Sequence, residues 1–178
     1  MSAWKRSQAG EGSRPEDAPA PDRPAASDKA AQLLALRPHF RRELEVKLAR
    51  AGYEPAETAE ALDRLARLRL LDDAALARSF VETTARRKGW GRLRVAQELA
   101  RRGAPDTAAE AALALVSADA DLEAAREAAR RWRRRGAGKP EALARHLSRR
   151  GFASSAIFKV LKEMARSTSG EEEAAADE

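Results

Sequence analysis

The pattern of apolar and polar residues along the chain repeats three times with helical spacing. In each copy, apolar residues stand eight and four positions before a glycine, and a leucine follows ten positions after it. The copies are Leu44, Leu48, Gly52 and Leu62; Val95, Leu99, Gly103 and Leu113; and Leu143, Leu147, Gly151 and Leu161. Residues four apart lie on one face of a helix, so each apolar pair predicts a buried helical face.

The three glycines predict where these helices end. Glycine readily adopts the positive φ that the C′ position of a helix cap requires, so Gly52, Gly103 and Gly151 are expected to be structural helix caps. Cations in the last helical turn offset the helix dipole. The arginines expected to do so are Arg50, Arg102 and Arg150.

A further helix is predicted before each of these helix pairs. The three additional helices are expected near 29–36, 73–88 and 119–135. The chain is therefore predicted to be all-α, with nine helices in three tandem three-helix units that form an elongated, curved array. The predicted units are 29–71, 72–117 and 118–166, with disordered tails at 1–28 and 167–178.

Composition supports this fold class. Alanine supplies 42 of the 178 residues, whereas Val, Ile and Thr together supply 11. Because sheets favour β-branched and aromatic side chains, and aromatics are only 4% here, helices are favoured. The segment 1–28 is rich in Pro, Ala and charge, and 167–178 carries five acidic residues, so both are expected to remain disordered.

The distribution of charge indicates an acidic partner. The formal net charge is +6, but residues 30–166 hold 29 basic and 18 acidic side chains, a net of +11. A helical core this basic is expected to bind nucleic acid or an acidic protein surface. The acidic segment 167–178 could compete for the same surface, and its deletion would then tighten partner binding.

Several classes of protein are excluded by composition. The chain has no cysteine and only His39 and His146 as histidines, so disulfides, thiolate sites and most imidazole metal or triad chemistry are not expected. No apolar run reaches the roughly 20 residues that span a bilayer, and no secretory signal is recognisable. We expect a cytoplasmic monomer without membrane contact, cofactor, metal or enzymatic activity.

The first unit and its junction to the second resemble the RecX family of bacterial regulatory proteins. Residues 37–48 (RPHFRRELEVKL) are similar to the family segment R-x-H-S-R-x-E-L-x-x-K-L, with Phe40 in place of serine. Residues 68–73 (LRLLDD) are similar to L-G-L-L-D-D, with Arg69 in place of glycine. These two departures concern a helix start and a turn.

The second and third units extend the resemblance. Residues 89–99 (GWGRLRVAQEL) are similar to the family segment G-aromatic-G-P-x-R-I-x-x-E-L, with Arg92 in place of proline. Residues 147–161 are similar to the closing segment of the family. The resemblance covers about residues 30–164 in the expected order, and this ordered set is far more specific than any one motif.

The resemblance implies a non-enzymatic modulator of the RecA recombinase. RecX proteins are all-helical tandem repeats that bind along the groove of the RecA–DNA filament, usually restrain its activity in DNA repair and the SOS response, and in many cases bind DNA weakly. A RecA-type recombinase filament is therefore the expected partner, with weak binding of single- or double-stranded DNA as a further possibility.

Basic clusters are the candidates for contact with this partner. Arg126, Arg130 and Arg134 form a stripe at helical spacing, flanked by Arg131 and Arg135; a solvated face assisted by nearby glutamates is the alternative interpretation. The full set of candidate contact residues is Arg86, Arg87, Lys88, Trp90, Arg92, Arg94, Arg126, Arg130, Arg131, Arg134 and Arg135.

Five residues have a structural interpretation beside or in place of a functional one. Trp90 could stack on a base or partner, or fill a gap between units. Trp132 is expected to belong to the core, because it continues an apolar face. Glu43 and Glu98 are expected to form ion pairs at i+4, with Lys47 and Arg102 respectively, and not to carry out acid–base catalysis. His39 is expected to cap or pack near a helix start.

Two other functions remain open from the sequence. Each helix–turn–helix pair could imitate a sequence-specific DNA-binding motif, although the helices that would read bases are alanine-rich. A helical scaffold for protein assembly is the other alternative. A phosphate binder loses affinity steeply with salt, whereas a binder of a protein filament requires that filament.

Overall fold

The computed structural model describes residues 23–136 and 138–175, and in these residues it contains helices and no strand. The first unit comprises α1 (Ala26–Leu36), α2 (Arg41–Arg50) and α3 (Pro55–Arg67). The second comprises α4 (Asp73–Ser79), η1 (Phe80–Ala85), α5 (Arg86–Lys88), α6 (Arg92–Arg101) and α7 (Asp106–Ala114). The third comprises α8 (Ala118–Arg133), α9 (Pro140–Arg149) and α10 (Ser154–Ala175).

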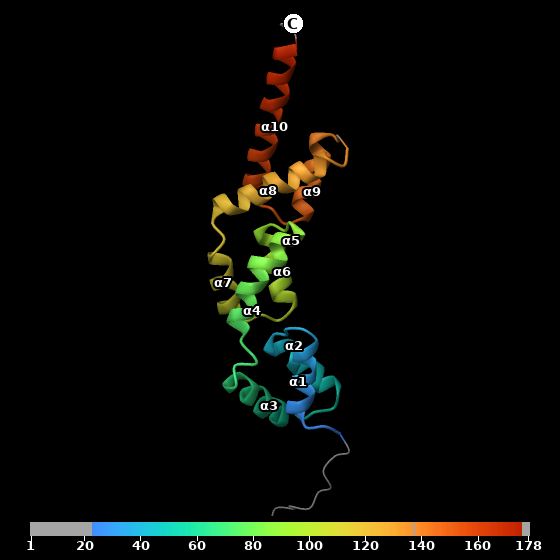
Figure 1. Ribbon diagram of the computed structural model, residues 1–178, viewed down its shortest axis with the longest axis vertical. Helices are drawn as coiled ribbons and strands as arrows, with labels where there is room; N and C mark the ends of the chain where they lie inside the picture. Colours follow the sequence, from blue (N-terminus) through green and yellow to red (C-terminus); the bar gives the residue numbers. More distant parts are fainter. Residues whose placement is uncertain (1–22, 137, 176–178) are drawn as a thin grey trace, which may run out of the picture.

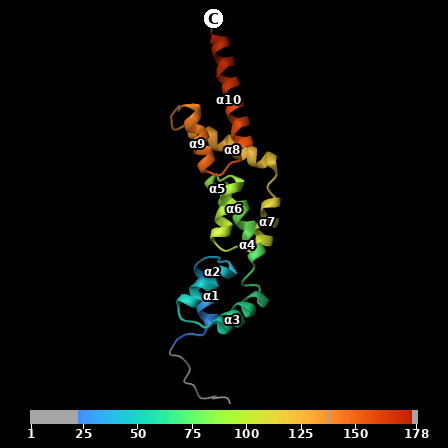
Figure 2. The same ribbon diagram turned by 180° about the vertical axis from the view of Figure 1, so that it is seen from behind.

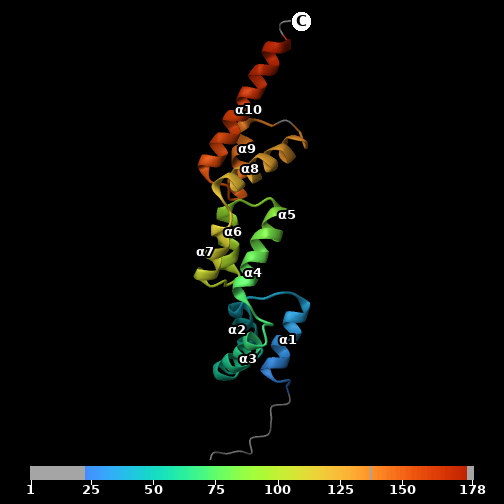
Figure 3. The same ribbon diagram turned by 60° about the vertical axis from the view of Figure 1, so that its left-hand side comes forward.

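The three units are stacked end to end in chain order. Figure 1 shows α1–α3 at one end, α4–α7 in the middle, and α8–α10 at the other end. The elongated shape persists in the reverse view and in the view turned by 60° (Figures 2 and 3). The predicted all-α tandem array is therefore confirmed.

Each unit has its own hydrophobic core. The apolar pairs found in the sequence are buried in all three copies, and Leu44, Leu48 and Leu99 are fully enclosed. The second core also receives Phe40, which precedes α2 in the first unit and is fully buried among second-unit residues. The first and second units therefore share apolar contacts, which help to stabilise domains of only about 45 residues.

The cap glycines behave as the sequence predicts. Gly52, Gly103 and Gly151 have φ of 84°, 77° and 78°. In each copy the following residue donates its N–H to the carbonyl of the apolar residue four before the glycine, as Tyr53 does to Leu48 at 3.1 Å. The glycine N–H bonds the carbonyl three before it, which completes a Schellman motif.

The helix predicted over 73–88 is interrupted by a π-helical segment. Phe80–Ala85 is π-helical, between the α-helical segments α4 and α5. The hydroxyl of Thr83 donates to the carbonyl of Ser79 at 2.6 Å. A threonine hydroxyl bonded to the i−4 carbonyl competes with the regular backbone bond, and π segments occur often at functional sites.

The boundaries of the folded part differ from those predicted. α1 begins at Ala26, not at 29, because Ala26 and Ala30 are buried against the first core. α10 continues to Ala175 and so passes the predicted limit at 166, through a segment rich in the helix formers Ala and Glu. Residues 1–22 and 176–178 of the predicted tails lie outside the described residues.

Candidate partner-binding groove

A groove of about 790 Å³ lies between the second and third units. Its walls come from the loop before α6, the end of α7, and the facing sides of α8 and α9. It brings together seven of the predicted contact residues, which are distant in sequence: Arg87, Lys88, Trp90, Arg92, Arg130, Arg131 and Arg135. We call this feature the basic groove.

The remaining predicted contact residues lie elsewhere. Arg94 is exposed beside the groove, with its guanidinium 5.6 Å from the Trp90 ring centroid. Arg126 connects α8 to α10 through a 2.8 Å bond from Nε to Glu163. Arg134 is exposed and does not line the groove. The side chain of Arg86 lies outside the described residues.

The arginines of α8 do not form an uncompensated stripe. Arg130 and Arg131 both bond Glu127, at 2.9 Å and 2.8 Å, and Arg126 also pairs with Glu123. These bonds lower the pKa of Glu127 below its ordinary value. The carboxylate of Glu127 therefore orients the guanidinium groups of Arg130 and Arg131 at the groove. Such a surface suits a partner with acidic groups at matching positions.

Two tryptophans, Trp90 and Trp132, line the groove from opposite units. Trp90 packs against the second core, and the ammonium of Lys88 lies 4.3 Å from its ring centroid. Trp132 packs against the third core, as predicted, and its ring centroid lies 6.3 Å from that of His146. Each ring thus combines core packing with exposure at the groove, an arrangement typical of interface aromatics.

The predicted ion pairs of Glu43 and Glu98 are wrong. Glu43 bonds Arg37 at 3.0 Å and Arg102 at 3.1 Å instead of Lys47, because it lies where the first two units meet. Glu98 bonds Arg101 at 2.9 Å, one position earlier on the helix than the predicted Arg102. Arg102 is not available to Glu98, since its guanidinium reaches into the first unit.

Two of the three arginines expected to act at helix ends, Arg102 and Arg150, have a further role. Arg102 donates to the carbonyl of Pro38, and Arg150 donates to those of Lys88 and Gly89, so both join neighbouring units. Arg50 has no such bond among the described residues. His39 is buried, and its Nδ1 lies 2.8 Å from the carbonyl oxygen of Arg37, so it packs near a helix start as predicted.

A metal site and a membrane span each have structural requirements that can be compared with the described ranges. Across residues 23–136 and 138–175, no group of three or more His, Asp or Glu side chains could hold a metal ion. No helix in the part of the chain that the structure describes is long and apolar enough to cross a membrane.

Comparison with known proteins identifies the family. The first three-helix domain of RecX matches residues 26–65, and the second matches residues 72–113. The regulatory protein RecX of Halorhodospira halophila is 42% identical over 141 residues, which cover 75% of this chain and 84% of that protein. The chain belongs to the RecX family. RecX of Chlorobaculum tepidum is 36% identical over 158 residues, covering 86% of this chain and 94% of that protein.

The RecX fold is supported independently by solved structures. The crystal structure of RecX from Lactobacillus salivarius aligns with a TM-score of 0.69 at 23% identity, and covers 79% of this chain and 94% of that chain. The resemblance found in the sequence is thus confirmed, and the relatives are named regulatory proteins. The three-helix units predicted from the glycine repeat coincide with RecX domains in the first two copies.

Proposed function

We propose that this chain regulates a RecA-type recombinase by binding along its DNA filament and restraining filament growth. The observation that supports the proposal is the basic groove, because it gathers seven predicted contact residues from two units into one surface. Family membership supports the regulatory role, and the elongated array suits a partner with an extended groove. The chain is proposed to act in the cytoplasm, without catalysis, during DNA repair.

The contact itself is proposed to be electrostatic with aromatic anchors. Arg87, Lys88 and Arg135 line the groove and are exposed. They can meet carboxylates of the recombinase or phosphates of its DNA. Trp90 and Trp132 supply apolar area within the same surface, as aromatic residues of binding hot spots do.

The test is the ATP turnover of a recombinase filament on single-stranded DNA. Increasing amounts of the chain should slow turnover and shorten filaments, and unchanged turnover at saturating protein would contradict the proposal. The double variant Arg87→Glu with Arg135→Glu should lose at least about tenfold in potency. Arg145→Glu with Arg149→Glu is the matched control, since both residues are exposed on α9 and lie outside the groove.

Direct DNA recognition makes a different prediction. A DNA-binding protein would bind naked DNA as tightly as the filament, and its affinity would fall steeply with salt. The helix α7, which follows the glycine turn of the second unit, has the sequence DTAAEAALA and offers few side chains that could read bases. We therefore expect weak, sequence-independent binding of naked DNA.

A further inference from the structure

The two junctions between units use equivalent positions of the repeat. At each junction, the arginine directly before the cap glycine of the later unit donates to the loop before the middle helix of the earlier unit. Arg102 donates to the carbonyl of Pro38 at 3.0 Å, and Arg150 to those of Lys88 and Gly89 at 2.5 Å and 3.2 Å. Pro38 and Gly89 each stand three residues before the first residue of that middle helix.

A second bond at each junction runs in the opposite direction. The backbone N–H of Arg41, at the start of α2, donates to the carboxylate of Asp73 at 2.9 Å. The N–H of Arg92, at the start of α6, donates to Asp121 at 3.0 Å. An aspartate of the later unit thus satisfies a free amide at the helix start of the earlier unit.

The backbones also approach closely at the junction of the second and third units. The N–H of Gly91 donates to the carbonyl of Arg150 at 2.8 Å, and that of Leu93 to Gly151 at 3.0 Å. A Cβ on Gly91 would lie 2.6 Å from the backbone N of Phe152. Gly91 has a φ of −79°, an angle that any residue can adopt. Glycine is therefore required here because the backbones of the second and third units approach each other closely, and not because of its backbone angle.

Two of the junction positions hold a different residue in the copy that makes no such junction among the described residues. The first unit, which packs against no earlier unit among the described residues, has Ala51 where Arg102 and Arg150 stand in the others. The third unit, which packs against no later unit among the described residues, begins its middle helix with Pro140, which has no N–H to donate. Arginines two before the glycine occur in all three units and are therefore explained by the helix end alone.

Both junction arginines are held in place by further partners. Arg102 also pairs with Glu43 of the first unit at 3.1 Å, and their side chains are 15% and 16% exposed. Its guanidinium lies 5.2 Å from the ring centroid of Phe40, the first-unit residue buried in the second core. Arg150 donates from Nε to Nε2 of His146 at 3.0 Å. Fixed guanidinium groups give each junction one preferred geometry.

We propose that Arg102 and Arg150 are positioning residues that set the angle between consecutive units and thereby the spacing of the surfaces presented to a partner. Arg150 holds the loop that carries Lys88 and Trp90, so the shape of the basic groove depends on it. The consequence for binding rests on the proposed function, because a filament with a fixed helical repeat accepts only one spacing of contacts. The junction geometry itself does not depend on that function.

The first experiment measures the angle without any partner. The chain has no cysteine, so Gln97→Cys and Ser148→Cys, both at exposed positions, place one spin label on α6 and one on α9. Arg150→Ala and Gly91→Ala should shift or broaden the distance distribution while helix content by circular dichroism stays the same. Arg149→Ala, which removes the same charge from an exposed neighbouring position, should leave the distribution unchanged. Superimposable distributions for all four proteins would overturn the proposal.

The second experiment measures binding to a recombinase filament on single-stranded DNA. Arg150→Ala and Gly91→Ala should each weaken binding by about tenfold, and Arg149→Ala by less than about threefold. Gly91→Ala changes no charge, so its effect separates positioning from contact. Arg150→Lys should restore part of both readouts, because an ammonium can donate to the same two carbonyls.

The outcomes of the two experiments separate the two proposals. Altered distances with full filament affinity would overturn the positioning role. If the unsubstituted chain binds no filament but the variants still show altered spin-label distances, the proposed function is overturned and the role of the junction residues is supported.

Discussion

The substitution Glu43→Gln is predicted to destabilise the protein by about 3 kcal/mol at pH 7. The carboxylate of Glu43 lies between the first and second units and is 16% exposed. It accepts bonds from Arg37 at 3.0 Å, Arg102 at 3.1 Å and the N–H of Phe40 at 3.1 Å. Glutamine keeps the shape of the side chain but loses the charge that these donors stabilise.

The magnitude follows from the pKa of Glu43. Burial is the largest single effect and raises the pKa, but the bonds from Arg37, Arg102 and Phe40 together lower it from 4.5 to about 2. Each pH unit corresponds to about 1.4 kcal/mol, which gives about 3 kcal/mol. Because the pKa of the folded state is depressed, this contribution is present above pH 4.5 and is lost as the pH falls towards 2.

The assay is urea unfolding followed by circular dichroism at pH 7, 4.5 and 3. The difference in free energy of unfolding between wild type and Glu43→Gln should be largest at pH 7 and shrink at pH 3. Glu98→Gln is the matched control: Glu98 pairs within one helix with Arg101, whose side chain is 71% exposed, so the loss should stay below about 1 kcal/mol. Equal losses for the two variants, or a difference independent of pH, would refute the reasoning.

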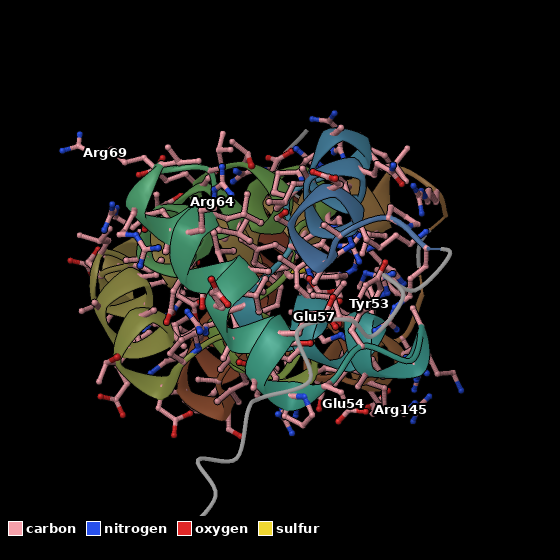
Figure 4. All side chains as sticks on the ribbon, turned by 90° about the horizontal axis from the view of Figure 1, so that it is seen from below. Tyr53, Glu54, Glu57, Arg64, Arg69 and Arg145 are labelled. Atoms are coloured by element: carbon pink, nitrogen blue, oxygen red, sulfur yellow. The ribbon has the colours of Figure 1, made fainter. Side chains whose placement is uncertain are left out.

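Three further substitutions test separate parts of the fold. Arg69 has a φ of 58° and its side chain points into solvent (Figure 4). Because glycine adopts this angle without backbone strain, Arg69→Gly should raise the free energy of unfolding in urea by up to about 1 kcal/mol. A lower free energy of unfolding for the variant would contradict backbone strain at Arg69. Leu99 is fully buried, so Leu99→Ala should lower the free energy of unfolding by about 2–5 kcal/mol and with it the thermal midpoint. A midpoint within error of wild type would contradict the burial of Leu99 in the second core. Burial lowers the pKa of His39 below 6.5, so the unfolded chain binds a proton more readily and the urea midpoint should fall as the pH drops below 6.5. His39→Gln should make the urea midpoint less dependent on pH. An unchanged pH dependence in this variant would exclude His39 as its cause.

The sequence predicts the units well because their signals are local. Apolar spacing and cap chemistry act within about ten residues, and the Schellman bonds at Gly52, Gly103 and Gly151 form as that reasoning requires. Family motifs then place the units in order. Arg69 has the positive φ that glycine adopts without strain, in keeping with the glycine of the family segment that residues 68–73 resemble.

The junctions and the groove could not be derived in the same way, because their partners are distant in sequence. Arg102 lies 64 residues from Pro38, and Arg150 lies 61 from Gly89. The prediction for Glu43 failed because its partner Arg102 is distant in sequence, and the prediction for Glu98 failed because Arg102 is engaged by the first unit. One signal was available: an arginine directly before the cap glycine occurs in the second and third copies, while the first has Ala51.

The most direct test of the central claim is binding of the purified chain to a RecA-type filament assembled on single-stranded DNA, measured by co-sedimentation beside naked DNA. The account predicts saturable binding that requires the filament and that weakens at least about tenfold in the Arg87→Glu, Arg135→Glu double variant. It predicts no comparable loss for the Arg145→Glu, Arg149→Glu control. Equal binding to naked DNA, or no co-sedimentation at saturating protein, would contradict it.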